Sequence, residues 1–110
     1  MRFARLLVDG VPRYARRDGE DYVLLQSAPW NGDALAPGER VAVKSAVYLP
    51  VTDASKVVAI GQNYAKHAAE MGKPIPVEPL IFMKPSTALN AHGAAIHLPP
   101  ASQEVHHESE

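Results

Sequence analysis

A histidine and a glutamate stand three residues apart in the middle of the sequence, at His67 and Glu70. If this stretch is helical, the two side chains are neighbours on one face, because residues three apart on a helix lie side by side. The carboxylate can then fix the imidazole tautomer and raise its basicity. The spacing indicates a general base with an acidic partner, and an exposed pair on a surface helix is the alternative interpretation.

Two further carboxylates, Glu108 and Glu110, alternate with Ser109 near the last residues. On a strand, alternate side chains share a face about 6 to 7 Å apart, close enough to converge on one cation. Carboxylate oxygens favour Mg²⁺, Mn²⁺ or Ca²⁺, and His106 on the same face could admit a softer metal. A solvated acidic tail has the same pattern.

A cation and two hydroxyl groups follow an apolar run in the second half of the chain. Lys84 comes directly after Leu80–Met83 and is followed by Pro85-Ser86-Thr87. A cation at a strand end can bind an anionic group, although a lysine there is ordinarily just exposed. Tyr64 and Asn63 could line the same substrate pocket, and Asn63 is equally well explained as a helix cap.

The residues before position 50 predict a small β unit. Three β-favourable segments follow one another, at residues 3–8, 11–16 and 22–25. Asp9-Gly10 and Asp18-Gly19 separate them as turns, which predicts a three-stranded meander. Pro12 predicts an edge position for the second strand, because proline donates no hydrogen bond to a neighbour.

A loop rich in Pro and Gly, at residues 29–38, follows the meander, and then come apolar runs at 40–43 and 46–49. The segment 49–55 has the composition of a connector. We therefore predict a small N-terminal β domain over residues 1–50 and a second domain over residues 51–110.

The second part alternates strand signals with one short helix. The expected strands are 56–61, a buried run whose Gly61 allows a sharp turn, then 80–83, 94–98 and 105–110. The expected helix is Tyr64–Met71, with Asn63 as its cap, three alanines on its inner face (Ala65, Ala68 and Ala69) and Gly72 as its stop. The fold class is mainly β (α+β).

Composition excludes several classes of protein. The chain has 110 residues, 46% hydrophobic and 21% charged, with a net charge of −1 and no cysteine. No apolar run approaches the about 20 residues of a membrane helix. No basic footprint for nucleic acid is present, and a small anionic substrate is compatible with the charge. A cytoplasmic location is the default for a chain without cysteine or signal peptide.

Three clusters in this order resemble the fumarylacetoacetate hydrolase (FAH) family. They contain the patterns Asn-Tyr-x-x-His-x-x-Glu, Phe-x-Lys-Pro and Glu-x-Glu, and they occupy residues 61–71, 79–88 and 107–110. The resemblance covers Lys56 to Glu110, and the lead-in looks like the small N-terminal domain of many bacterial members. It implies a mixed β-sandwich roll with one short lid helix, a bound Mg²⁺ or Mn²⁺, and a homodimer.

The resemblance also implies roles for single residues. Glu108 and Glu110 resemble two of three carboxylate metal ligands, and His67 and Glu70 resemble the lid dyad that activates water or moves a proton. Lys84 resembles the pocket-side lysine, with Asn63 and Tyr64 as further substrate contacts. The third ligand, an aspartate, lies well downstream in the family, so we expect this chain to be an N-terminal fragment with little activity by itself.

The activity expected of the parent enzyme is isomerisation or C–C bond hydrolysis of 2-oxo, 1,3-dicarbonyl or hydroxymuconate-type acids through a metal-stabilised enolate. The bacterial hydroxymuconate and hydroxyheptadienedioate isomerases of aromatic compound catabolism are the favoured subgroup. Acylpyruvate hydrolysis and oxaloacetate decarboxylation use the same enolate and stay open. Outside enzymes, a small non-catalytic β binding domain or a helix-lidded organic-acid binder would share the pattern.

Overall fold

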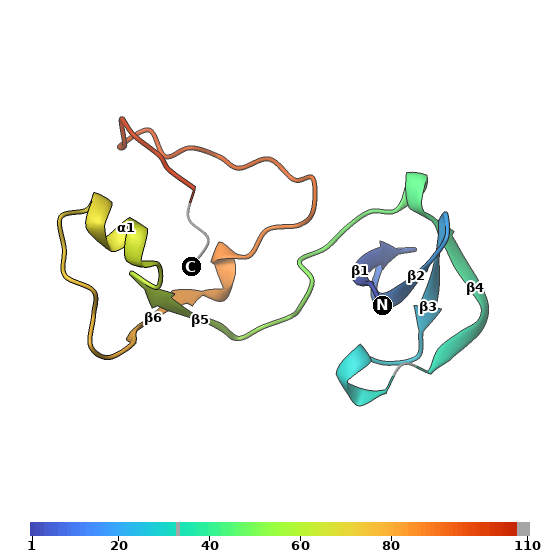
Figure 1. Cartoon of the computed structure of the whole chain (residues 1–110). Helices are drawn as coiled ribbons and strands as arrows, with labels where there is room; N and C mark the ends of the chain where they lie inside the picture. Colours follow the sequence, from blue (N-terminus) through green and yellow to red (C-terminus); the bar gives the residue numbers. More distant parts are fainter. Residues whose placement is uncertain (33, 108–110) are drawn as a thin grey trace. The chain divides into compact units, whose positions relative to one another are not determined.

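The computed structural model describes residues 1–32 and 34–107 (Figure 1). They form two compact units, Met1–Asp53 with Asn90–Ala95, and Ala54–Leu89 with the described residues from Ile96 onward. Each unit is built on antiparallel strands, and the described residues contain one short α-helix. The mainly β fold is confirmed. No helix in the described ranges is long and apolar enough to cross a membrane.

The first unit contains a four-stranded antiparallel sheet in the order β1-β2-β3-β4. Its strands are β1 (Phe3–Val8), β2 (Val11–Asp18), β3 (Asp21–Leu25) and β4 (Leu35–Ala42). The predicted meander is confirmed in its first three strands. Asp9 and Gly10 have φ of 50° and 78°, the left-handed pair that a two-residue hairpin turn requires.

The prediction that Pro12 marks an edge strand is wrong for the strand as a whole, because β2 lies between β1 and β3. The prediction is correct for the immediate surroundings of Pro12. Pro12 is paired with Leu7 of β1, whereas β3 pairs only with the far half of β2, from Ala15 onward. The amide of Leu7 points away from β2, so the nitrogen of Pro12 faces the side on which β3 has not begun.

The fourth strand begins earlier than the sequence predicts. We expected a loop as far as Gly38, yet β4 starts at Leu35. The ladder keeps pairing by a register shift: Arg40 is opposite Val23 and Leu35 is opposite Leu25. A bulge of this kind accommodates Pro37 and the left-handed Gly38 inside the strand. The presence of proline and glycine in the sequence does not by itself reveal such a bulge.

The outer edge of β1 is also paired. The amide of Leu7 donates to the carbonyl of Val47, and the amide of Leu49 donates to the carbonyl of Arg5, each at 2.9 Å. Tyr48 sits between them in an isolated bridge to Leu6. The apolar run predicted at residues 46–49 thus covers the edge that a terminal strand would otherwise leave open.

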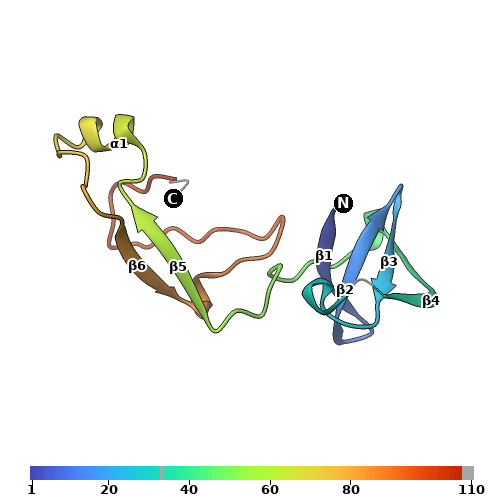
Figure 2. The ribbon, with the colours of Figure 1, turned by 60° about the horizontal axis from the view of Figure 1, so that its bottom comes forward.

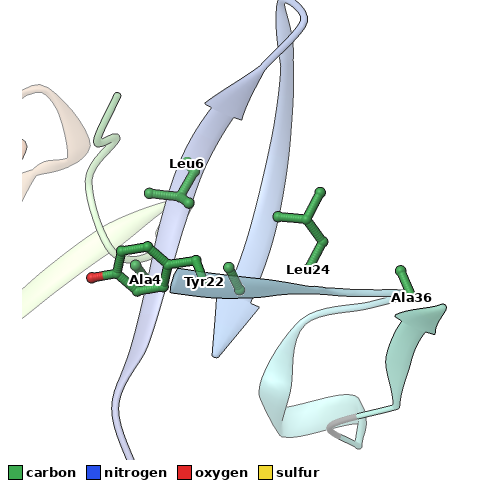
Figure 3. Packing of buried hydrophobic residues seen from close by; sticks show 6 residues of the cluster. Ala4, Leu6, Tyr22, Leu24 and Ala36 are labelled. Atoms are coloured by element: carbon green, nitrogen blue, oxygen red, sulfur yellow. The ribbon is translucent and has the colours of Figure 1, made fainter. Parts of the chain in front are cut away.

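The core of the first unit is small and aliphatic, with one tyrosine at its rim (Figure 3). Leu6 is fully buried and Leu24 is 2% exposed. The other members of the cluster are Ala4, Ala15, Tyr22 and Ala36. Burial of a leucine side chain contributes about 1.5–3 kcal/mol, so these two leucines carry much of the apolar stabilisation.

The second unit contains a two-stranded antiparallel sheet of β5 (Lys56–Gly61) and β6 (Leu80–Pro85), and the helix α1 (Ala65–Glu70) follows β5 (Figure 2). Both strands were predicted. The expected burial of the first is wrong, because only Ala59 in it is buried and every residue of β6 is exposed. The burial that β5 has lies mainly on the face of Ala59, whereas Val58 on the opposite face is 61% exposed.

Two other expected strands are absent from the described residues. Residues 94–98 and 105–107 have no ladder partner and are irregular, and residues 108–110 lie outside the described ranges. An apolar run becomes a strand only when its amides and carbonyls meet another strand. β-Propensity therefore overestimated the sheet content here.

Truncation of Leu6 to alanine tests the position of the core. Leu6→Ala should lower the free energy of unfolding of the first unit by about 2–5 kcal/mol, because it removes a fully buried side chain. The matched control is Leu7→Ala, the exposed neighbour on the same strand, which should cost about 0.5 kcal/mol. Urea unfolding followed by far-ultraviolet circular dichroism measures both, and equal losses would contradict the assigned register.

Candidate functional site

The helix that carries His67 and Glu70 begins after a backbone reversal at Gln62, whose φ is 53°. The N-cap is Tyr64, which makes no side-chain capping bond, and the helix starts at Ala65. The expectation that Asn63 caps the helix is therefore wrong. The helix, Ala65–Glu70, is one residue shorter at each end than the predicted Tyr64–Met71, because Tyr64 and Met71 are its two caps.

The reversal was expected at Gly61 and is found at Gln62 instead. Gly61 is the last residue of β5 and does not adopt a left-handed conformation. A Cβ atom there would lie 3.3 Å from Cδ2 of Leu80 and 3.5 Å from Cε1 of Phe82. The glycine lets the Leu80 side chain of β6 pack closely against it. Left-handed backbone at a residue with a side chain, as at Gln62, is a strained feature typical of functional sites.

The end of the helix is confirmed at Gly72. Its φ is 66°, its amide donates to the carbonyl of Ala69 at 3.0 Å, and the amide of Lys73 donates to the carbonyl of Ala68 at 2.9 Å. This pair of bonds is a Schellman motif. Of the three alanines expected on the inner face, Ala68 is fully buried, whereas Ala65 and Ala69 are exposed.

The predicted neighbours His67 and Glu70 lie close together. Nδ1 of His67 is 3.8 Å from Oε2 of Glu70, and the two side chains are 31% and 77% exposed. That distance suits an ion pair with a protonated imidazole and is longer than a hydrogen bond. The pair can stabilise an imidazolium ion once the histidine has accepted a proton.

The two side chains line a pocket of about 550 Å³ together with Met71, His106 and His107. Residues about 40 positions apart in sequence thus share one cavity, since His106 and His107 directly precede Glu108. Nε2 of His106 is 3.7 Å from Oε2 of Glu104. A histidine, a carboxylate and two further imidazoles around one cavity provide groups that can bind and move protons on a small polar molecule.

The two predicted metal ligands, Glu108 and Glu110, lie outside the described residues. Within residues 1–32 and 34–107, no three His, Asp or Glu side chains gather to hold a metal ion. The donor chemistry of the two glutamates, hard carboxylate oxygens, fits Mg²⁺ or Mn²⁺. Their part as ligands stays a prediction.

The predicted substrate residues do not gather in this pocket. Asn63 lines a separate hollow of about 350 Å³ beside the loop 75–79 and the start of β6, and Tyr64 is exposed. Lys84 is exposed, pairs with Val57, and has its Nζ 5.7 Å from the centre of the Phe82 ring. Val57 is four positions before Gly61, which is about 13 Å along β5. Their roles stay predictions.

Sequence reasoning missed two features of this region. Gln62 has a backbone conformation that no side-chain pattern signals, and Met71 lines the pocket although it was considered only as the end of the helix. The position of Met71 could have been found from the helix itself, because it is four residues after His67 and so shares its face.

Comparison with protein families divides the chain between residues 50 and 56, close to the break after Asp53 in the structure, although the structure also assigns Asn90–Ala95 to the first unit. Residues 56–110 match the family described as fumarylacetoacetate (FAA) hydrolase C-terminal, and residues 1–50 match the one described as Rv2993c-like, N-terminal. The first match covers half of the chain.

Curated relatives and one solved structure match as well. The chain is 50% identical over 56 residues to the oxaloacetate tautomerase YcgM of Escherichia coli, covering 51% of this chain and 26% of that protein. It is 42% identical over 59 residues to the mitochondrial oxaloacetate tautomerase FAHD1 of rice, covering 51% of this chain and 26% of that protein. A structure from Mycobacterium abscessus matches 94% of this chain and 41% of its own, with 34% identity and a TM-score of 0.73. The chain spans between 22% and 31% of the length of the curated relatives it matches.

Substitution at Gln62 tests whether the reversal holds the helix in place. Gln62→Gly should slow hydrogen exchange of the helical amides of Ala68 and Met71, because glycine adopts the left-handed conformation without the penalty of about 1–2 kcal/mol. Gln62→Val should speed that exchange about fivefold or more relative to Gln62→Gly, since a β-branched residue is least tolerated there. The same rate in both variants would contradict the assigned conformation.

Proposed function

Because the chain belongs to the fumarylacetoacetate hydrolase family, we propose that it is part of a divalent-metal-dependent enzyme that enolises small 2-oxo acids. The substrate class is a keto acid or diacid with a hydrogen next to its keto group. Oxaloacetate is the representative member, since the relatives from Escherichia coli and rice are named oxaloacetate tautomerases. Isomerisation of hydroxymuconate-type acids is a rival within the same chemistry, because it also moves a proton across an enolate.

The observation that carries the proposal is the shared pocket of His67, Glu70, His106 and His107. Enolisation requires a base next to the carbon that loses the proton and a cation near the oxygen that gains charge. His67 with Glu70 supports the first requirement. The approach of residues 106 and 107 to the helix supports the second, because the two proposed metal ligands follow them directly in the sequence.

The proton would move between carbon and oxygen in two steps. Neutral His67 accepts the proton from the carbon beside the keto group, and the electron pair of the broken C–H bond forms the C=C bond of the enolate. The carboxylate of Glu70, 3.8 Å from Nδ1, stabilises the resulting imidazolium ion. The imidazolium then returns the proton to the enolate oxygen, which completes the conversion of keto form to enol and leaves His67 neutral.

A divalent metal would be held by Glu108 and Glu110, with Mg²⁺ or Mn²⁺ as the fitting ions. When bound, it would supply positive charge to the oxygens of a keto acid and so favour loss of the neighbouring proton. Glu70 and His67 would serve in proton transfer, because the proposed ligand pair does not include them.

A homodimer remains part of the proposal. Val58, Ile81 and Met83 are 61%, 65% and 68% exposed, which leaves apolar side chains on both strands of the second sheet uncovered. Exposed apolar surface of this kind favours association with further protein.

Replacement of His67 in the protein that carries this chain tests the assignment of the base. His67→Gln should lower kcat for conversion between the enol and keto forms of oxaloacetate by about 10²–10⁴-fold, the usual contribution of a positioned general base. The absorbance of the enol follows the reaction, and pyruvate formation distinguishes decarboxylation from tautomerisation. The matched control is His97→Gln, an exposed histidine outside the pocket, and equal rates in the two variants would refute the assignment.

Removal of the side-chain carboxylates of Glu108 and Glu110 tests the metal site without an activity assay. Glu108→Ala combined with Glu110→Ala should weaken Mn²⁺ binding about tenfold or more, because each lost carboxylate removes a charged oxygen ligand. Electron paramagnetic resonance of free Mn²⁺ measures the affinity, with Mg²⁺ as competitor. Glu104→Ala is the control of similar charge, and a loss as large as in the double variant would indicate unspecific attraction.

A further inference from the structure

The first unit contains a cavity of its own, with a volume of about 480 Å³. That volume lies within the range of about 300–1,000 Å³ typical of small-molecule sites. Its wall combines apolar side chains with cationic and hydroxyl groups and includes no carboxylate. The lining residues are Phe3, Ala4, Arg5, Arg17, Tyr22, Val43, Tyr48, Leu49, Val51, Asn90 and His92.

A ladder of three aromatic rings forms one side of this cavity. The rings of Tyr22 and Tyr48 meet edge to face with centroids 6.1 Å apart, and those of Tyr48 and His92 do so at 5.0 Å. The loop that carries His92 is closed by Asn90, whose amide group donates to the carbonyl of Ala95 at 3.0 Å. Edge-to-face pairs fix ring orientation, so the wall is formed before any ligand arrives.

The hydroxyl groups of the ladder offer a hydrogen-bond donor to the cavity. The oxygens of Tyr22 and Tyr48 are 3.4 Å apart, and one hydroxyl donates to the other. That contact, with burial, raises the pKa of Tyr48, so its phenol stays protonated at neutral pH. The two hydroxyl groups have two hydrogens, and only one of them is used in the bond between the tyrosines. The other hydrogen can be donated to a ligand. Figure 3 shows the Tyr22 hydroxyl directed away from Leu24 and Ala36.

Two arginines supply positive charge beside these hydroxyls. The side chain of Arg5 is only 14% exposed, yet its ion-pair partner, Asp53 at 3.4 Å, is 86% exposed. A largely buried cation whose counterion is exposed to water is weakly compensated, because water screens the attraction between the two charges. The guanidinium of Arg17 lies 5.6 Å from the centre of the Tyr22 ring and 3.6 Å from the exposed Glu20.

We propose that this cavity binds the carboxylate of a small organic acid, with the anion between Arg5, Arg17 and the tyrosine hydroxyls and its apolar body against Phe3, Leu49 and Val51. The guanidinium groups match a carboxylate in charge and geometry. The apolar wall favours an organic acid over an inorganic anion, because phosphate would leave that wall in contact with water. This site is separate from the proposed enolisation site, and neither proposal depends on the other.

The test is titration of the 110-residue chain with benzoate, followed by chemical shifts of the tyrosine and arginine side chains. Arg17→Gln should raise the dissociation constant about tenfold or more, since hydrogen bonds to a charged group are the strong ones. Tyr48→Phe should raise it about threefold, because it removes one neutral donor and keeps the ring. These variants avoid Arg5, whose loss could disturb β1, and circular dichroism verifies that each stays folded.

The matched control is Arg40→Gln, which removes an arginine paired with Asp18 at 2.9 Å outside the cavity. Unchanged affinity in that variant, with the losses above, supports the site. An equal loss there would show general attraction between charges, and unchanged affinity in Arg17→Gln and Tyr48→Phe would overturn the site. Inorganic phosphate binding as tightly as benzoate would overturn the part assigned to the apolar wall. His67→Gln should leave benzoate affinity unchanged, which separates this result from the outcome for enolisation.

Discussion

The pairing of β5 with β6 determines where the candidate residues of the second unit lie. β5 delivers the chain to Gln62 and the helix α1, and β6 carries Lys84 on the neighbouring strand. The two strands are held by one antiparallel ladder, and the absence of a side chain at Gly61 lets Leu80 and Phe82 pack over its end. A side chain there would require the Leu80 side chain to shift by a few tenths of an ångström.

The short helix depends on this frame more than on its own sequence. It has 6 residues, well below the about 12–15 at which an isolated helix becomes marginally stable. The burial of Ala68 and the bonds that close the helix at Gly72 replace what propensity cannot supply. The distance between His67 and Glu70 therefore depends on the pairing of β5 with β6, on the burial of Ala68 and on the bonds that close the helix at Gly72. Elements with so few buried contacts belong to the least stable parts of a fold, where segments that move during binding are commonly found.

The sequence predicted most of the fold wherever the signal was local. Turn pairs such as Asp9-Gly10 require particular backbone angles, and alternating segments next to them pair as hairpins, so the meander and β5 were correct. The errors in strand content concern long-range pairing: β4 started before Pro37, and residues 94–98 found no partner. The errors at the start of the helix are local, because residue type alone does not fix which residue adopts the left-handed conformation or becomes the N-cap. At the candidate site, the spacing of His67 and Glu70 predicted their proximity. It could not predict the shared cavity with His106, because that depends on how distant segments meet.

The two units differ in how deeply they bury their charged side chains. This difference affects how strongly those side chains interact with other charges. In the first unit both edges of β1 are hydrogen-bonded and the core is closed, so Arg5 is held in a largely buried position with little freedom to reach water. A cation in that setting interacts strongly with any anion that replaces water, because the local dielectric is low. In the second unit Glu70 is mostly exposed and interacts through a more polar medium. Its effect on His67 is correspondingly weaker unless further protein or a bound substrate excludes water from the pocket, and desolvation would strengthen the pair at the moment when a proton is transferred.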